Sequence, residues 1–323
     1  MTDRAVRTVL GDVAPGELGV VNYHEHLFQT TPLLPGDELD DEEHSRAEAA
    51  DLVAAGVGCL VEATPIGLGR VPSAVRRISR DLGVHVVHTT GVHRESHYPA
   101  RPDLTAKSTA QLAQAFRAEL VDGLVDDRDA HDAEPARHGR AGLVKVGIGY
   151  WSVSAFERRA IEAAGGVSAE LGAPVMVHLE HGSAAHEVLT MLAEAGCPED
   201  RVALAHIDRN PDPGLHLELA ARGAYLGYDG CARHKSWPDS VLVDCLEKVV
   251  AGGGEDRTLL GGDVARRSRY ESYGGMPGLA YTYRRFLPRV RAAIGEQGVA
   301  LLTTKNPSRW LTWRTAPEID QKR

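Results

Sequence analysis

Short apolar segments rich in β-branched residues recur eight times along this chain, with helix-like stretches between them. Most of these segments are hydrophobic almost throughout, which is typical of parallel strands covered on both faces. The intervening stretches are rich in Ala, Glu, Arg and Leu, and several end in Gly, a common residue at helix C-termini. The eight segments are residues 19–26, 59–64, 85–93, 142–149, 174–180, 202–208, 224–230 and 258–264.

A strand followed by a helix, repeated eight times, predicts an α/β fold, either a (β/α)8 TIM barrel or a large doubly wound sheet. Barrels of this kind commonly use a chain of this length as one domain. We therefore expect a single domain over residues 1–323. The charged, turn-rich segment 126–140 is predicted to be a surface insertion, and the tail to form a last helix that frays over 314–323.

The composition indicates which kinds of partner the protein can have. The net charge is −9, so no basic field would attract nucleic acid. The N-terminus shows no cationic segment followed by a long apolar run, and no stretch approaches the ~18 apolar residues of a membrane span. Four scattered cysteines without a C-x-x-C pair are typical of free thiols. We expect a cytoplasmic protein that acts on a small molecule, without a membrane or nucleic-acid partner.

The most informative polar residues lie at the ends of the apolar segments. In a barrel, these strand ends converge on one pocket at the C-terminal face, where active sites of this fold lie. The H-x-H spacing in the first segment puts both imidazoles on the same side of a strand. The residues are His24 and His26 in the first segment, Lys145 in the fourth, His178 in the fifth, His206 in the sixth and Asp263 in the eighth.

Four imidazoles and one carboxylate suit zinc, or else manganese, cobalt or iron. One ion needs only three or four such ligands, so the surplus suggests two metals joined by an anionic bridge. A lysine ammonium has no lone pair for a metal, but burial lowers a lysine pKa, and a neutral amine can add carbon dioxide to give a carbamate. The spacing makes that chemistry conceivable for Lys145; an ordinary ion pair at the strand end is the alternative.

Two further residues have open interpretations. Asp208 stands two residues after His206 and is either a carboxylate that orients this ligand or an ordinary loop residue. Tyr98 follows the third segment, as do Arg94 and His97, and His93 ends that segment; each of the four could line the pocket or not.

The ordered set of motifs resembles the phosphotriesterase family of the amidohydrolase superfamily. The set is Val-Asn-Tyr-His24-Glu-His26-Leu, Val-Lys145-Val-Gly, Val-His178, Ala-His206-Ile-Asp208 and Gly-Gly-Asp263. The opening Arg-Thr-Val-Leu-Gly-Asp-Val-Ala-Pro-Gly-Glu-Leu-Gly is similar to the family's N-terminal hairpin, and Thr-Lys-Asn306-Pro307-Ser-Arg-Trp to the start of its C-terminal helix. The resemblance implies a TIM barrel with a short N-terminal β-hairpin and a C-terminal helix.

The same resemblance implies roles for the six residues. His24, His26 and Asp263 would hold a more buried divalent ion, His178 and His206 a more exposed one, and carbamylated Lys145 with a hydroxide would bridge them. General metal chemistry then has the bridging hydroxide attack a carbonyl or phosphoryl group that the exposed ion polarises. Asp263 would carry the proton away. The resemblance therefore marks Asp263, Lys145 and His206 as catalytic.

The sequence predicts the substrate less directly than the metal ligands. Family members that hydrolyse paraoxon carry a histidine in the strand-seven segment, roughly where Asp229 and Gly230 lie here. The later loops instead resemble the branch of phosphotriesterase homology proteins and phospho-sugar lactonases. We predict that two or three basic side chains of these loops face the pocket and clamp a phosphate or carboxylate. The candidates are Arg233, Lys235, Arg266, Arg267 and Arg269.

The sequence thus favours a lactonase or carboxyl-ester hydrolase with an anionic or phosphorylated substrate. An amidase for N-acyl compounds and a phosphotriesterase remain alternatives within the same chemistry. A non-catalytic metal- or ligand-binding protein on a hydrolase scaffold is the alternative from another class. Relatives in this family are often dimers, so a homodimer is also open.

Overall fold

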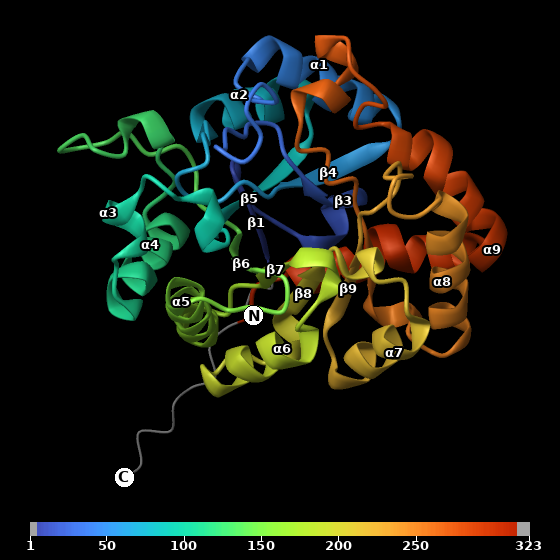
Figure 1. Ribbon diagram of the computed structural model, residues 1–323. Helices are drawn as coiled ribbons and strands as arrows, with labels where there is room; N and C mark the ends of the chain where they lie inside the picture. The colour runs from blue at the N-terminus through green and yellow to red at the C-terminus, as the bar shows by residue number, and fades with distance from the viewer. Residues whose placement is uncertain (1–4, 315–323) are drawn as a thin grey trace.

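Eight parallel strands form a nearly closed barrel in the computed structural model, which describes residues 5–314 (Figure 1). Neighbouring strands in space are also consecutive in sequence, from β3 to β10, as in a (β/α)8 barrel and unlike a doubly wound sheet. The predicted barrel is therefore confirmed. The strands are β3 (Val20–Glu25), β4 (Val57–Glu62), β5 (His85–Gly91), β6 (Leu143–Ile148), β7 (Val175–Leu179), β8 (Val202–Ala205), β9 (Tyr225–Tyr228) and β10 (Thr258–Leu260).

The residues after β10 close the barrel against β3. The backbone amides of Gly262 and Asp263 donate hydrogen bonds to the carbonyl oxygen of His24, at 3.2 and 3.0 Å. These bonds place Asp263 beside the end of the first strand, although 239 residues separate it from His24 in the sequence. Barrel closure thus brings the polar residues after the first and last strands together at the C-terminal end of the barrel.

Helices cover the outside of the barrel (Figure 1). Ser108 and Ser154 begin two of them with capping boxes, in which side chain and backbone satisfy each other's free groups. Within residues 5–314, no helix is both long and apolar enough to cross a membrane. The helices are α1 (Glu42–Ala54), α2 (Pro72–Leu82), α3 (Pro102–Thr105), α4 (Thr109–Val121), α5 (Ala155–Leu171), α6 (Ala185–Glu194), α7 (Pro213–Arg222), α8 (Asp239–Ala251), α9 (Leu287–Ala300) and α10 (Asn306–Leu311).

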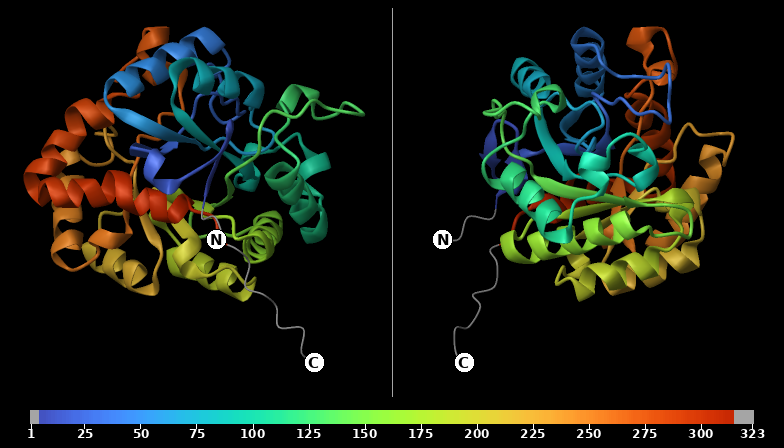
Figure 2. Two further views of the ribbon diagram at one scale, coloured as in Figure 1. Left: turned by 180° about the vertical axis from the view of Figure 1, so that it is seen from behind. Right: turned by 60° about the vertical axis from the view of Figure 1, so that its left-hand side comes forward.

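The two ends of the described chain lie together at the end of the barrel opposite the C-terminal ends of the strands. Strands β1 (Val6–Thr8) and β2 (Gly11–Val13) form the expected antiparallel hairpin. Helix α10 is the expected C-terminal helix, and its Trp310 is buried with the indole Nε1 donating to the carbonyl of Arg201 at 3.1 Å. The view from behind shows the last helices crossing this face (Figure 2). Apart from residue 314, the predicted frayed tail lies outside the described residues.

The segment 126–140 lies largely at the surface and extends from the side of the barrel (Figure 1). Its first residue is nevertheless buried. The Asp126 carboxylate accepts hydrogen bonds from the backbone amide and the hydroxyl of Ser73, at 2.9 and 2.6 Å. The neighbouring Asp127 pairs with Arg70 at 3.2 Å. Two carboxylates therefore anchor this exposed segment to the start of α2.

We predict that Gly91→Ala destabilises the protein by about 2–5 kcal/mol. Gly91 ends β5 at a φ of +104°, and an added Cβ would lie 1.9 Å from the carbonyl oxygen of Lys145. The matched control is Gly166→Ala in α5, where a Cβ meets nothing within 4 Å and helix propensity favours alanine by up to about 1 kcal/mol. Denaturant unfolding of both variants measures the difference. Equal stability of Gly91→Ala and wild type would contradict the close approach of β5 and β6.

Candidate metal centre

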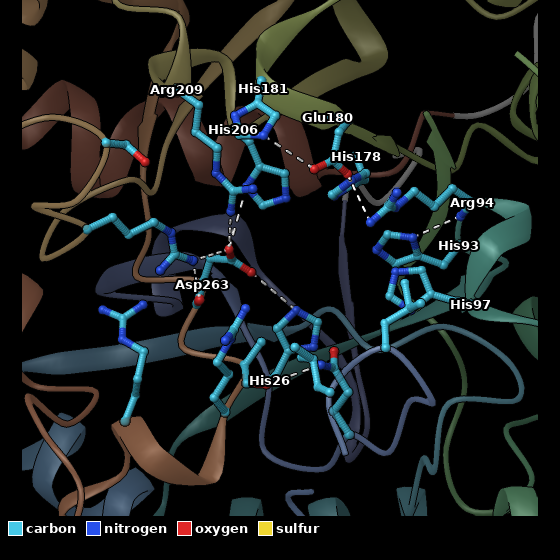
Figure 3. A pocket seen from close by; sticks show the side chains of 18 of the residues that line it. His26, His93, Arg94, His97, His178, Glu180, His181, His206, Arg209 and Asp263 are labelled. Atoms are coloured by element: carbon cyan, nitrogen blue, oxygen red, sulfur yellow. Dashed lines mark hydrogen bonds and ion pairs between the residues drawn. The ribbon is translucent and has the colours of Figure 1, made fainter. Parts of the chain in front are cut away.

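A cavity of about 770 Å³ opens at the C-terminal ends of the strands (Figure 3). Its floor carries candidate metal ligands, and its walls carry mainly basic side chains from the loops. The polar lining residues include His26, His93, Arg94, His97, Lys145, His178, Glu180, His206, Arg209, Arg233, Lys235, Asp263, Arg266 and Arg269.

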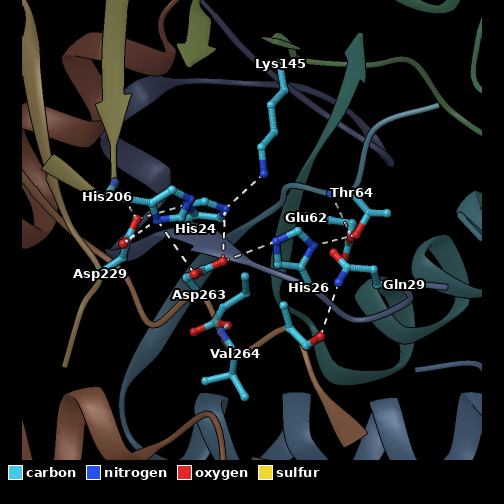
Figure 4. Close-up of polar contacts among 12 residues, drawn as sticks. His24, His26, Gln29, Glu62, Thr64, Lys145, His206, Asp229, Asp263 and Val264 are labelled. Carbon is cyan, nitrogen blue, oxygen red and sulfur yellow. Dashed lines mark hydrogen bonds and ion pairs between the residues drawn. The ribbon is translucent and has the colours of Figure 1, made fainter. Parts of the chain in front are cut away.

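Asp263 faces the two histidines of the H-x-H motif (Figure 4). Its Oδ1 lies 3.5 Å from Nε2 of His24 and 3.4 Å from Nε2 of His26. Ligands bound at 2.0–2.2 Å around a tetrahedral ion lie roughly 3.3 Å apart. The three atoms therefore have the spacing of ligands that share one ion.

Lys145 points at the same cluster from β6. Its Nζ lies 3.1 Å from Nε2 of His24, and the side chain is buried. Burial lowers the pKa of Lys145 to about 8, against the opposing effect of the Asp263 and Asp229 carboxylates. A neutral amine is therefore far more accessible here than at an exposed lysine.

His178 and His206 form the other side of the cluster. Their ring centroids are 4.7 Å apart, and His206 also approaches His24 at 5.0 Å. Burial lowers the pKa of His206 to about 4 and that of His178 well below the usual value. The same effect lowers the pKa of His26 to about 3. The imidazoles are thus neutral near pH 7, the form that binds a metal, and this donor set fits divalent ions.

Asp229, at the end of β9, holds two of these imidazoles in place (Figure 4). Its carboxylate lies 3.0 Å from Nδ1 of His24 and 2.7 Å from Nδ1 of His206, and it also accepts the hydroxyl of Tyr23. Such bonds put the proton on Nδ1 and leave Nε2 for a metal. His24, His206 and Asp229 are themselves close enough to enclose an ion, but these are hydrogen-bond distances. We interpret Asp229 as an orienting residue.

The carboxylate that hydrogen-bonds the histidines is Asp229 and not Asp208, for which the sequence left both an orienting role and an ordinary loop position open. Asp208 is buried, and its Oδ2 accepts the backbone amide of Gly230 at 2.7 Å, whereas its Oδ1 has no partner. Neighbouring positions in sequence suggested Asp208. The available signal for Asp229 was its place at the end of the seventh apolar segment, the position that the ligands occupy on other strands.

His26 has a separate support. Its Nδ1 lies 2.7 Å from the hydroxyl of Thr64, and the amide of Thr64 donates to the buried carboxyl group of Glu62 at 3.2 Å. Burial raises the pKa of Glu62 to about 7. The end of β4 thus fixes the ring of His26 with Nε2 toward Asp263.

The second oxygen of Asp263 faces basic side chains. Its Oδ2 accepts Arg209 at 2.7 Å and also contacts the guanidinium of Arg233. Burial alone would raise the pKa of Asp263, but His206, Arg233 and His24 outweigh it and hold the pKa well below the usual value. Sequence reasoning did not single out Arg209, which follows His206 in a short helical turn.

Only some of the residues expected to bind substrate line the cavity. Arg233, Lys235 and Arg266 line the cavity, as does Arg269. Arg267 instead stacks on the ring of Tyr273, 4.5 Å from its centroid, outside the cavity lining.

Tyr98 is also outside the lining. It is buried, donates its hydroxyl to the carbonyl of Ile66 and accepts the amide of His93, both at 2.9 Å. Tyr98 thus supports the backbone of His93, which does reach the cavity.

Comparison with known proteins shows similarity over nearly the whole chain. The model of the phosphotriesterase family matches residues 4–311. A phospho-furanose lactonase of Mycoplasmopsis synoviae is 27% identical, over 99% of this chain and 95% of that protein. An N-acetyltaurine hydrolase of Danio rerio is 28% identical, over 96% and 98%. The solved structure of a lactonase from Listeria monocytogenes has a TM-score of 0.87 at 30% identity, covering 96% of this chain and 99% of that one.

We predict that Asp229→Asn lowers metal affinity roughly 10–100-fold, because an amide cannot accept both imidazole N–H groups as a carboxylate does. The matched control is Asp208→Asn. Burial and the Asp229 carboxylate raise the pKa of Asp208, so the amide resembles its protonated form, and we expect little change. Metal competition with a chromogenic chelator measures both. Equal losses in the two variants would contradict the orienting role of Asp229.

Proposed function

The chain belongs to the phosphotriesterase family and is a hydrolase, and on this basis we propose that it hydrolyses a lactone or carboxyl ester that carries an anionic group. The observation that carries this proposal is the charge of the cavity. Apart from Lys145, six lysine and arginine side chains line it, against the two carboxylates of Glu180 and Asp263, in a protein whose net charge is −9.

Two divalent ions complete the proposed site. His24, His26 and Asp263 would hold one, and His178 and His206 the other. Lys145, after its neutral amine adds carbon dioxide and releases a proton, would supply the shared anion. The mixed nitrogen and oxygen donors suit zinc, with manganese, cobalt and iron as competitors. Bound ions of this kind polarise a substrate oxygen and acidify water.

We assign the proton transfer to Asp263, the carboxylate that lines the cavity and faces Nε2 of His24 and His26. Its low pKa keeps it ionised before the reaction. Arg209 and Arg233 hold Oδ2, so the carboxylate is fixed with Oδ1 toward the histidines. Asp263 would accept the proton of the attacking water and release it toward the leaving group.

We assign recognition of the anion to the basic side chains of the loops after β9 and β10. Arg233, Arg266 and Arg269 have planar guanidinium groups that match phosphate and carboxylate in two hydrogen bonds each. Lys235 adds a further positive charge to the lining. The name of the mycoplasma relative, a phospho-furanose lactonase, supports a phosphorylated lactone.

An amide bond is the second candidate. Relatives named N-acetyltaurine hydrolase favour it, and N-acetyltaurine is itself an anion that the same basic lining would attract. A neutral phosphotriester is disfavoured, because it offers no negative charge to these side chains.

A pH-indicator screen of lactones, esters and N-acyl amino acids, each with and without a phosphate or carboxylate group, tests this function. We expect turnover of the anionic members. Arg266→Ala should raise KM for them about 3–10-fold, a modest effect because Arg266 is partly solvated. Arg267→Ala is the control, since Arg267 lies outside the lining. Turnover of neutral phosphotriesters alone, or equal effects of both substitutions, would overturn the anionic substrate.

A further inference from the structure

The catalytic cavity continues into a second hollow of about 830 Å³. Five residues line both: Arg94, Glu180, His181, Arg209 and Ser236. Figure 3 shows Arg94, Glu180, His181 and Arg209 gathered on one side of the cavity, across from His26. The second hollow, which we call the aromatic lobe, is further lined by Tyr150, Trp151, Ser183, Asn210 and Trp237.

Exposed aromatic side chains concentrate in the aromatic lobe. Among residues 5–314, seven large hydrophobic side chains are exposed, and three of these are aromatic. All three line the lobe: Tyr150 is 62% exposed, Trp151 64% and Trp237 42%. Apolar surface grouped in a hollow and rimmed by polar residues is typical of a binding site.

Hydrogen bonds hold the backbone of Trp151 and the indole of Trp237, although both side chains are exposed. Trp151 has a φ of +45°, a conformation that costs energy for a residue with a side chain. Its backbone amide donates to the hydroxyl of Ser183 at 3.0 Å, and that hydroxyl donates to the carbonyl of Glu180 at 2.8 Å. Glu180 also lines the catalytic cavity, so the position of Trp151 is tied to the cavity wall.

Trp237 is tied to the same wall from another loop. Its indole Nε1 donates to the carbonyl of Arg209 at 3.1 Å. Because its one polar atom is already bonded, the ring offers mainly carbon surface to a ligand. Arg209 contacts Asp263 through its guanidinium and Trp237 through its carbonyl.

We propose that the aromatic lobe is a substrate subsite that binds a flat, uncharged ring. The proposal rests on the proposed function, since it takes the adjoining cavity as the place of reaction. Arg266 and Arg269 line the cavity but not the lobe. A molecule that spans both would place its anionic group by these arginines and its ring by the tryptophans. The substrate class is therefore an ester or lactone with an anionic end and a cyclic apolar end.

Three succinate half-esters test this assignment: monoethyl, monohexyl and monobenzyl succinate. They share the carboxylate and the scissile bond, and differ only in the group that would reach the lobe. We expect kcat/KM for the benzyl ester to exceed that for the ethyl ester about 10-fold, mainly through KM. The hexyl ester distinguishes a subsite for rings from a general preference for apolar groups. A ring subsite predicts a lower kcat/KM for the hexyl ester than for the benzyl ester, and a general apolar preference predicts an equal or higher one.

The benzyl-to-ethyl ratio within each variant is the readout. Trp151→Ala and Trp237→Ala should bring the ratio close to one, and Trp151→Phe should restore most of it. Met276→Ala is the control, because Met276 is exposed but lies outside the lobe. A ratio near one in wild type, with the ethyl ester hydrolysed, overturns the subsite and leaves the proposed function intact.

A binding measurement separates the two proposals. If no ester or lactone is hydrolysed, the proposed function fails, and titration calorimetry with 4-phenylbutyrate and butyrate still tests whether the lobe binds a ring. Tighter binding of 4-phenylbutyrate that Trp237→Ala abolishes supports the subsite, whereas equal binding of both acids overturns it. A dimeric wild type that Trp151→Ala makes monomeric, with the ester ratio unchanged, would also overturn it and assign the aromatic face to a second copy.

Discussion

The site depends on one buried carboxylate. Asp229 receives hydrogen bonds from Tyr23 and from the Nδ1 atoms of His24 and His206, which lie at the ends of the first and sixth barrel strands. A buried charge is tolerated only where such partners surround it. The carboxylate in turn fixes the tautomer and orientation of both rings. Without barrel closure, which sets His24 beside Asp263 and β9, these groups would not meet.

Asp263 connects the two halves of the site. One oxygen faces His24 and His26, and the other faces Arg209 and Arg233. A substrate anion that draws on Arg233 would therefore act on the same carboxylate that faces these two candidate metal ligands. Arg209 extends the connection to the aromatic lobe through its carbonyl bond to Trp237. The proposed recognition of the substrate anion and the proposed proton transfer thus involve the same side chains.

The alternation of apolar segments and helix-like stretches predicted a parallel α/β fold, because buried parallel strands are apolar throughout. The family resemblance then favoured the barrel over a doubly wound sheet. The prediction overestimated the length of every barrel strand except β4: the sixth segment was predicted over 202–208, but β8 ends at Ala205. His206 has a φ of +65° and already belongs to the loop. Apolar and ligand residues beyond the strand are buried like strand residues, so hydrophobicity cannot show where pairing stops.

The site could be predicted from the sequence where a side chain lies on a barrel strand or within three residues of its end. His24, His26, Lys145, His178, His206 and Asp263 converge for this reason. Loop residues could not be placed. Tyr98 turns inward to bond Ile66 and His93, and Arg267 turns away to stack on Tyr273. These orientations depend on contacts within irregular loops, which no strand or helix periodicity describes, whereas the pairing of Asp229 with His24 joins residues 205 positions apart.

The metal content of the purified protein tests the central claim most directly. After the protein has been loaded with zinc and dialysed, inductively coupled plasma mass spectrometry should find about two zinc ions per chain, as in two-metal hydrolases. Lys145→Ala should lose metal and activity together, whereas Lys248→Ala, an exposed lysine of α8, should retain both. Full metal occupancy with unchanged turnover in Lys145→Ala, or a wild type that binds no metal, would contradict the account.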